Sequence, residues 1–264
     1  MRVGIIGYGY VGSAVAASYP DDKIMINDPK YPIRSKSIKK LKEKCQAIFV
    51  CVPTPQSDTG ECDASILDRV LAKLEGYQGI VVAKSTAGPE IYAELEQRYE
   101  LKLAHVPEFL TQARAKYDYV NPHKIVVGCR EEIRQAVTDV LMNSAVNFDR
   151  VNIEYCSIQE ASFFKYLANT QLAIKVIVNN EYADLAKRLG VKWDRVVDIA
   201  RTDYRLGATH WSVPGPDGER GFGGACFPKD TAALSYIAEE HGIDLSVLNA
   251  VIEKNKTYRG NNGA

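Results

Sequence analysis

Residues 2–18, RVGIIGYGYVGSAVAAS, decide the fold of this chain. The apolar run from Arg2 to Ile6 predicts a short strand, and three glycines follow it at the spacing G-x-G-x-x-G. Gly7 permits a tight turn, Gly9 lets the backbone approach a pyrophosphate, and Gly12 lets the next helix pack closely on the strand. The small residues behind Gly12 predict that helix, whose N-terminus favours a bound phosphate. This stretch therefore predicts the first strand-turn-helix unit of a dinucleotide-binding sheet.

An acidic residue adds to the cofactor signal. Asp28 follows the next predicted strand, Lys23 to Asn27, at the place where a carboxylate accepts hydrogen bonds from ribose hydroxyls and repels a 2′-phosphate. We therefore expect NAD as the cofactor, although the nearby Lys30 and Arg34 leave a strict preference over NADP open. A glycine turn without any cofactor is the alternative. The cofactor-binding residues expected in this region are Gly7, Gly9, Tyr10, Val11, Gly12 and Asp28.

Strand and helix signals alternate through the first half of the chain. Further strands are predicted at Ala47 to Val52, Ile80 to Lys84, Leu101 to His105 and Lys124 to Val127, and helices at Ile66 to Leu74, Pro89 to Tyr99 and Glu131 to Asn143. This alternation is typical of β-α-β units and hence of a parallel sheet covered by helices. We expect an α/β fold with a Rossmann-like NAD-binding domain at residues 1–153.

Helical signals replace the alternation in the second half. Apolar residues recur at helical spacing from Ile158 to Leu189, and Gly190 is a plausible C-cap. A helix of this length spans between domains or lies in a subunit interface. Shorter helices are predicted at Trp193 to Thr202, Thr231 to His241 and Ser246 to Lys256. We expect a long connecting helix and an all-α substrate and dimerisation domain at residues 154–264.

The composition excludes several classes of protein. The 264 residues include 33 Lys+Arg and 33 Asp+Glu, a zero formal charge, whereas a nucleic-acid binder needs a basic surplus or stripe. The basic run Arg34 to Lys44 is typical of a solvated helix face. No apolar stretch approaches the roughly 20 residues that cross a bilayer, so we expect a cytoplasmic protein without membrane contact. Six cysteines without a C-x-x-C pair and four scattered histidines predict neither a disulfide framework nor a metal site.

A reactive thiol is predicted in the loop GFGGACFPKD, residues 221–230. Pro228 suits the first turn of a helix, so Cys226 would lie just before a helix N-terminus and beside Lys229. Both neighbours favour the thiolate, which is the reactive form. The glycines would let backbone N–H groups approach a substrate and contribute to an oxyanion site. The alternative is a buried cysteine in a structural loop.

A lysine and an asparagine share one face of the long helix. Lys165 and Asn169 are four residues apart, among apolar neighbours. By itself this pattern favours a lysine whose stem covers apolar surface while its ammonium reaches water. Combined with a nicotinamide site and the Cys226 thiol, it suits oxidation of an alcohol to an aldehyde, capture by the thiol, and a second hydride transfer.

These motifs occur in the order found in the UDP-glucose/GDP-mannose 6-dehydrogenase family, which the chain resembles over nearly its whole length. The matching stretches are Gly7 to Gly12, Cys51 to Pro55 with Gly60 and Asp63, Lys84 to Thr86, Val106 to Leu110, Asn121 to Pro122, Ile125 to Gly128, Phe164 to Asn169, Asp203 to Gly207 and Gly221 to Asp230. The resemblance implies a four-electron oxidation of the C6 alcohol of a nucleotide sugar, UDP-glucose above all, to a uronate with two NAD+.

The resemblance also implies roles for individual residues. Cys226 would form a thiohemiacetal and then a thioester, and Lys165 and Asn169 would bond to the oxygen that becomes negatively charged. Glu108, Thr86 and Asp230 would place and activate water. Thr54, Thr86 and Lys229 would line the cofactor side. The substrate-binding set would be Glu108, Phe109, Leu110, Lys165, Asn169, Arg205, Phe222, Gly223 and Cys226.

Two further expectations concern assembly. Arg205 would reach a substrate in a neighbouring subunit of a homodimer formed through the long helix. Family members continue into a third domain that holds the nucleotide, whereas this sequence ends at Ala264. We therefore expect a short form that uses its central domain, a neighbour or a separate partner chain for this purpose. The alternatives are a truncated or partner-dependent NAD-binding module with little activity, and a two-electron β-hydroxyacid-type dehydrogenase that needs the lysine but not the cysteine.

Overall fold

A computed structural model describes residues 1–149 and 151–260 of the chain. Contacts divide these residues into two compact units. Unit 1 comprises Met1–Pro55 and Asp63–Lys165, and unit 2 comprises Gln56–Cys62 and the chain from Tyr166 onward. The change from one unit to the other falls inside the long helix. The domain division at residues 153 and 154 stays a prediction, and its residues 150 and 261–264 lie outside the described part of the chain.

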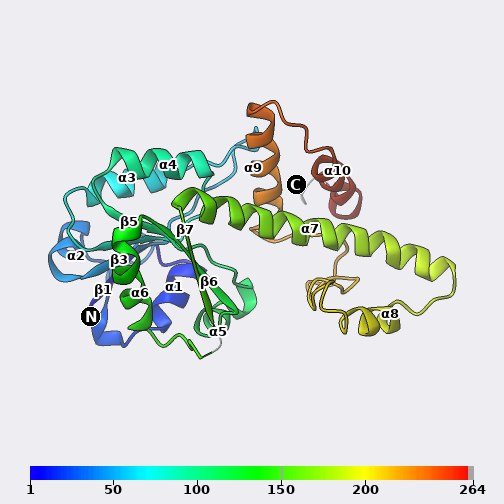
Figure 1. The fold of residues 1–264 in the computed structure, drawn as a ribbon, viewed down its shortest axis with the longest axis horizontal. Coiled ribbons are helices and arrows are strands. Elements are labelled where there is room, and N and C mark those ends of the chain that lie inside the picture. The colour runs from blue at the N-terminus through cyan, green and yellow to red at the C-terminus, as the bar shows by residue number, and fades with distance from the viewer. Residues whose placement is uncertain (150, 261–264) are drawn as a thin grey trace. The chain divides into compact units, whose positions relative to one another are not determined.

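Unit 1 is built on a seven-stranded sheet (Figure 1). In spatial order its strands are β2 (Ile24–Asn27), β1 (Val3–Ile6), β3 (Ala47–Val50), β4 (Ile80–Ala83), β5 (Lys102–His105), β6 (Lys124–Cys129) and β7 (Asn152–Cys156). Neighbouring strands are parallel except at β5 and β6, which are antiparallel. The expected α/β fold is confirmed, with the correction that β6 and β7 run against the other five strands.

Strand β7 is absent from the sequence-based expectations. It pairs in parallel with β6 at the edge of the sheet. Three of its five residues are exposed, and two of these are the polar Asn152 and Glu154. An edge strand buries little of its surface, so its sequence lacks the continuous apolar run that marks the inner strands β1, β3 and β4, whose residues are all buried.

Helices cover both faces of the sheet of unit 1. The helices are α1 (Tyr10–Ala17), α2 (Ile38–Lys44), α3 (Ser65–Leu74), α4 (Pro89–Arg98), α5 (Ala115–Val120) and α6 (Arg134–Met142). Apolar residues of α1, α5 and α6 form one core cluster with alternate strand residues such as Val3, Ile5 and Phe49. On the opposite face Leu41 of α2 lies against Gly4 of β1. Alternate strand residues therefore face two different helical layers, as a doubly covered sheet requires.

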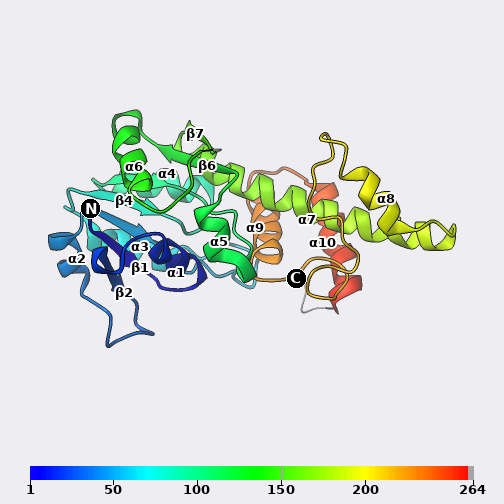
Figure 2. The same ribbon diagram turned by 90° about the horizontal axis from the view of Figure 1, so that it is seen from below.

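Unit 2 is helical. It contains most of α7 (Ile158–Arg188) together with α8 (Trp193–Ala200), α9 (Phe227–Glu240) and α10 (Ser246–Arg259), as Figures 1 and 2 show. Gly190 has a φ of 70° just beyond α7, which confirms the predicted glycine stop. The small core of unit 2 joins Ala173 and Ile177 of α7 to Phe222 and Val251. None of the helices in the described residues is long and apolar enough to span a membrane.

Candidate active site

The three glycines of the loop between β1 and α1 serve two purposes: two are needed for packing, and one leaves room for a ligand. A Cβ on Gly7, whose φ is 88°, would lie 2.5 Å from the Cys51 carbonyl oxygen, and one on Gly12 would lie 2.0 Å from that of Gly7. These two glycines are needed by the fold itself. A Cβ on Gly9 would meet nothing within 4 Å. The open space at Gly9, beside the N-terminus of α1, fits the close approach of a pyrophosphate.

Asp28 fixes this loop from the end of β2. Its side chain accepts hydrogen bonds from the backbone N–H groups of Tyr8 at 2.5 Å and Lys30 at 2.7 Å. The carboxylate is therefore buried at the carboxyl end of a parallel strand, where a cofactor ribose is bound in this kind of sheet. Tyr10 and Val11 occupy the first turn of α1. These positions suit the cofactor roles expected of them, which stay predictions.

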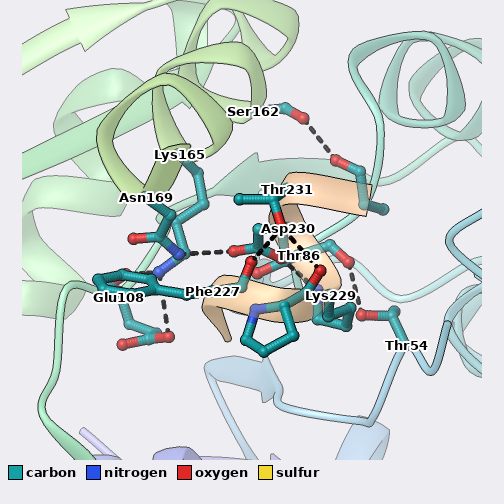
Figure 3. Close-up of polar contacts among 12 residues, drawn as sticks. Thr54, Thr86, Glu108, Ser162, Lys165, Asn169, Phe227, Lys229, Asp230 and Thr231 are labelled. Carbon is teal, nitrogen blue, oxygen red and sulfur yellow. Dashed lines mark hydrogen bonds and ion pairs between the residues drawn. The ribbon is translucent and has the colours of Figure 1, made fainter. Parts of the chain in front are cut away.

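The segments that follow β3 and β4 are tied together. The Thr54 hydroxyl donates to the Thr86 carbonyl at 2.6 Å. The Ser162 hydroxyl of α7 donates to the Ala87 carbonyl at 2.5 Å, which anchors the start of the helix on the same segment (Figure 3). Thr54 and Thr86 are thus neighbours in unit 1, as a shared cofactor side would require.

Lys165 and Glu108 form a buried ion pair in unit 1 (Figure 3). The Lys165 ammonium lies 3.2 Å from Glu108 Oε1 and also donates to the Glu108 carbonyl. Glu108 Oε2 accepts from the backbone N–H of Leu110 at 2.7 Å. The two side chains are only 3% and 5% exposed. The interpretation of Lys165 as a lysine that reaches water is therefore wrong, because its ammonium is buried and paired inside the unit.

Two aromatic rings lie beside this ion pair. The Phe109 and Phe164 rings meet edge to face at 5.7 Å, and Lys165 Nζ lies 5.3 Å from the Phe109 centroid. Lys124 Nζ lies 4.2 Å from the Phe164 centroid. Phe109 and Leu110, both half-buried, thus lie beside Lys165 and Glu108, and their expected place beside a substrate stays a prediction.

A larger group of buried polar side chains lies at the carboxyl ends of the central strands. We call it the strand-end cluster. Lys84, His105 and Glu108 are buried and come from the ends of β4 and β5 or the segment after β5, Cys51 is half-buried after β3, and Tyr119 of α5 and Lys165 of α7 act on Lys84 from the helices. Burial lowers the pKa of Lys84 to about 8 and that of His105 to about 3, and it raises the pKa of the Cys51 thiol to about 12. Cys51, Glu108 and Lys165 act electrostatically on Lys84.

No role was expected of Lys84 or His105. Lys84 follows the apolar strand β4, and His105 is the last residue of β5. A polar residue at the carboxyl end of an inner parallel strand is the signal that could have found them, because ligands bind at that edge of such sheets.

Unit 2 holds a second buried polar arrangement around Asp230. Its carboxylate accepts a hydrogen bond from the Asn169 amide at 2.5 Å and pairs with the Lys229 ammonium at 2.5 Å (Figure 3). Its backbone N–H donates to the carbonyl of Cys226, which is the N-cap of α9 and half-buried. The expected place of Cys226, just before a helix N-terminus, is confirmed. Helix α9 begins at Phe227, four residues earlier than expected.

Two helices clamp the loop that carries Cys226. Asn255 of α10 accepts from the Phe222 N–H at 2.8 Å and donates to the Phe222 carbonyl at 3.0 Å. Asn180 of α7 accepts from the Gly221 N–H at 3.3 Å. Phe222 is buried and the next residue, Gly223, is half-buried. The clamp fixes the backbone that leads into Cys226, and the sequence alone gave no sign of it.

Arg205 does not join these contacts. Its side chain is 73% exposed, and its guanidinium bonds to Asp203 two residues away at 2.6 Å. An exposed guanidinium suits the expected role toward a neighbouring subunit, which stays a prediction.

Two family models match the chain. Residues 159–257 match the central domain of the UDP-glucose/GDP-mannose dehydrogenase family, and residues 30–146 match the NAD binding domain of the same family. Together they cover most of the chain. The glycine loop precedes the matched residues, so its assignment rests on its own geometry.

Known proteins agree with these matches. UDP-glucose 6-dehydrogenase of Rickettsia felis is 32% identical over 231 residues, which cover 83% of this chain and 49% of the relative. UDP-glucose 6-dehydrogenase TuaD of Bacillus subtilis is 31% identical over 225 residues, covering 80% of this chain and 46% of the relative. This chain thus spans about half the length of such relatives.

The fold is shared as well. A structure of a UDP-glucose dehydrogenase from the archaeon Pyrobaculum islandicum superposes with a TM-score of 0.82 at 26% identity, covering 97% of this chain and 68% of that one. The chain belongs to the UDP-glucose/GDP-mannose dehydrogenase family, of which it carries the NAD-binding and central domains.

Proposed function

We propose that the chain catalyses the NAD-dependent, four-electron oxidation of a nucleotide-sugar C6 alcohol to the uronate, with UDP-glucose as the leading substrate. The main observation behind the proposal is that two motif residues of α7 each contact a buried carboxylate. Each unit buries one carboxylate against a nitrogen of α7, Glu108 against Lys165 and Asp230 against Asn169. Burial of charged groups is costly even when they are paired, and such groups cluster at functional sites, so these contacts support a catalytic use of the motif.

The cofactor fits the glycine loop. Gly9 leaves open space at the N-terminus of α1, and Asp28 presents a carboxylate at the end of β2. Gly7, Gly9 and Gly12 would hold the pyrophosphate and Asp28 the ribose, with Thr54 and Thr86 on the nicotinamide side. When bound, NAD supplies the acceptor for a hydride from the substrate carbon.

The residues of unit 1 would manage charge and protons at the substrate oxygen. The Lys165 ammonium donates hydrogen bonds and would stabilise an oxygen that becomes negatively charged. Glu108 would orient Lys165 and, with Thr86, place water for the hydrolytic step. In unit 2 Asp230 accepts from the Asn169 amide nitrogen, which has a second hydrogen that would be donated to a substrate oxygen.

The Cys226 thiol would carry the covalent intermediates of the reaction. The first oxidation converts the alcohol to an aldehyde, and the thiol adds to it as a thiohemiacetal. The second oxidation gives a thioester, which water cleaves to the carboxylate while the thiol is restored. One alcohol, two NAD+ and one water therefore give one carboxylate, two NADH and three protons. The half-buried place of Cys226 at the N-cap of α9 supports this use.

An exposed apolar surface in unit 2 supports the homodimer. Tyr182 and Leu185 of α7 are 58% and 56% exposed, and Ile199 of α8 is 58% exposed. Tyr182 and Leu185 are three residues apart and so share one face of α7, and exposed apolar side chains of this size are typical of protein interfaces. A second copy of the chain would cover this surface and bring its Arg205 toward the neighbouring substrate site.

A turnover assay tests the proposal. Wild-type protein is incubated with NAD+ and a panel of nucleotide sugars that includes UDP-glucose, and NADH and acid are both measured. We expect two NADH per uronate, and no acid from Cys226→Ala. Cys156→Ala, which removes another half-buried thiol, serves as the matched control and keeps wild-type turnover.

Two results would contradict the proposal. NAD binding without turnover on any nucleotide sugar would favour an NAD-binding module. One NADH per product, with full activity of Cys226→Ala, would favour a two-electron dehydrogenase that needs only Lys165.

A further inference from the structure

Lys84 is a buried charged residue that the proposed reaction does not use. It follows Ala83, the last residue of β4, and its backbone N–H donates to the Val50 carbonyl at 2.8 Å. Only 6% of the residue is exposed. Its ammonium lies 5.3 Å from the centroid of the Tyr119 ring. Two inner strands of the sheet thus fix the backbone of Lys84 at the carboxyl edge, and its side chain is held among the strand-end cluster.

The cluster carries more positive than negative charge. Its carboxylate, Glu108, is already paired with Lys165. The other titratable groups that face Lys84 are neutral at pH 7, because burial raises the already high pKa of the Cys51 thiol and the Tyr119 phenol and lowers that of the His105 imidazole. Glu108 pairs with Lys165 and acts on Lys84 only electrostatically, so Lys84 provides the surplus charge.

A buried surplus charge needs a physical reason. Removing an ammonium from water without a counter-charge costs several kcal/mol, and methionine would fill similar volume without this cost. The same low dielectric strengthens the attraction between the ammonium and any negative charge that develops nearby. The proposed reaction develops negative charge on the substrate oxygen beside Lys165 before each hydride transfer.

We propose that Lys84 is a positioning residue whose ammonium supplies the surplus positive charge that stabilises the substrate oxyanion through the Glu108–Lys165 pair. With Lys84 present, the field of Glu108 acts on two cations, so the site around Lys165 keeps a net positive charge for the substrate oxygen. Without Lys84, the Glu108 carboxylate neutralises Lys165 fully. This inference rests on the proposed function and extends its machinery by one residue.

The inference predicts a distinctive pH dependence. Lys84, with its pKa near 8, loses its charge at a pH where an arginine in its place stays protonated. The ratio of kcat for Lys84→Arg to that of the wild type should therefore rise as the pH increases through about 8. Taking the ratio cancels any pH effect that the two proteins share, such as proton release by the reaction.

The experiment compares wild type, Lys84→Arg, Lys84→Met and Lys102→Met with UDP-glucose and NAD+ between pH 6.5 and 9.5. Lys102 is an exposed lysine at the start of β5 and serves as the matched control. We expect kcat of Lys84→Met to fall on the order of 10- to 100-fold at pH 7 with little change in KM. Lys84→Arg should retain most of the wild-type kcat at pH 7 and exceed it at pH 9.5. Lys102→Met should match the wild type throughout.

Results that would overturn this inference differ from results that would overturn the proposed function. A constant Lys84→Arg ratio, or one that falls with pH, would overturn the inference, and a falling ratio would indicate that neutral Lys84 acts as a base. A Lys84→Met variant with wild-type kcat at pH 7 would overturn it as well. Absence of turnover by the wild type is a failure of the proposed function instead.

A measurement without turnover checks the charge itself. The wild type binds fewer protons in the folded than in the unfolded state between pH 8 and the ordinary lysine pKa of 10.5, so its stability gains on that of Lys84→Met as the pH rises through this range. We expect the Tm difference between the two proteins to change in that direction. An unchanged difference would show that Lys84 titrates normally, and the inference would then be wrong.

Discussion

The buried polar residues of unit 1 differ from those of unit 2 in how their charges are balanced. In unit 1 the carboxylate of Glu108 pairs with Lys165 and also acts electrostatically on a second buried lysine, Lys84. In unit 2 Asp230 is matched by Lys229, whose side chain is 19% exposed, and by the neutral amide of Asn169. Unit 1 therefore contains a buried positive charge without a counter-charge of its own. In unit 2 the buried carboxylate is balanced, and hydrogen bonds from two helices hold the loop that carries Cys226. Under the proposed function, unit 1 would stabilise developing charge and unit 2 would hold in place the backbone that carries the Cys226 thiol.

Removal of each carboxylate tests this contrast most strongly. Glu108→Gln leaves two buried ammonium groups without a counter-charge, and we expect it to lower the free energy of unfolding by about 4 kcal/mol at pH 7. Asp230→Asn leaves a lysine that can reach water, and we expect a loss of about 2 kcal/mol. Urea denaturation of both variants beside the wild type measures the difference. Equal losses, or a larger loss for Asp230→Asn, would contradict the charge imbalance.

The dependence of stability on acid pH tests unit 1 through His105, which burial keeps neutral. Burial lowers the pKa of His105 to about 3, so below its ordinary value of 6.5 the unfolded state binds a proton that the folded state does not. Stability should therefore be lost as the pH falls from 6.5 toward 3, by about 3 kcal/mol at pH 4. His105→Gln should remove most of this dependence, as followed by denaturant unfolding at several pH values.

The exposed His123 provides the control for that titration. His123→Gln should keep the wild-type pH dependence. If His105→Gln also keeps it, then another group causes the acid sensitivity, and the neutral state of His105 in the strand-end cluster is wrong.

The clamp of unit 2 predicts a smaller and more local effect. Asn255→Ala removes both hydrogen bonds to the Phe222 backbone and leaves a buried N–H and carbonyl unsatisfied, at a cost of about 2 kcal/mol or less. Hydrogen exchange of the Phe222 amide should accelerate, and alkylation of Cys226 should change in rate while that of the buried Cys129 does not. Unchanged exchange at Phe222 would show that α10 does not hold this loop.

Local sequence signals predicted the elements of the fold well. The glycine loop, the inner strands and the long helix each depend on residues within a few positions of one another, as Gly190 and the apolar run of α7 illustrate. Strand β7 was missed because an edge strand is half-exposed and carries no strong apolar pattern. The antiparallel direction of β6 was missed because strand direction is set by the connection and the neighbour, which no local signal records.

The candidate site could be predicted only as a set of residue types. The sequence placed Lys165 and Asn169 on one helix face and Cys226 before a helix. It could not show that Lys165 is paired, because Glu108 lies 57 residues away, nor that Asn169 meets Asp230, 61 residues away. The role of Lys84 was invisible for the same reason, since its surplus charge exists only relative to Cys51, His105 and Glu108 in space.

By itself, then, the sequence determined the cofactor loop, the alternation that builds the sheet, and the position of Cys226 at the start of a helix. These depend on backbone conformation and on side-chain periodicity, which short stretches encode. Only the tertiary structure decided which charges are buried, which are paired and which one is left over. Desolvation and Coulomb energies depend on everything that packs around a group, and for Lys84 and Lys165 those neighbours come from distant strands and helices.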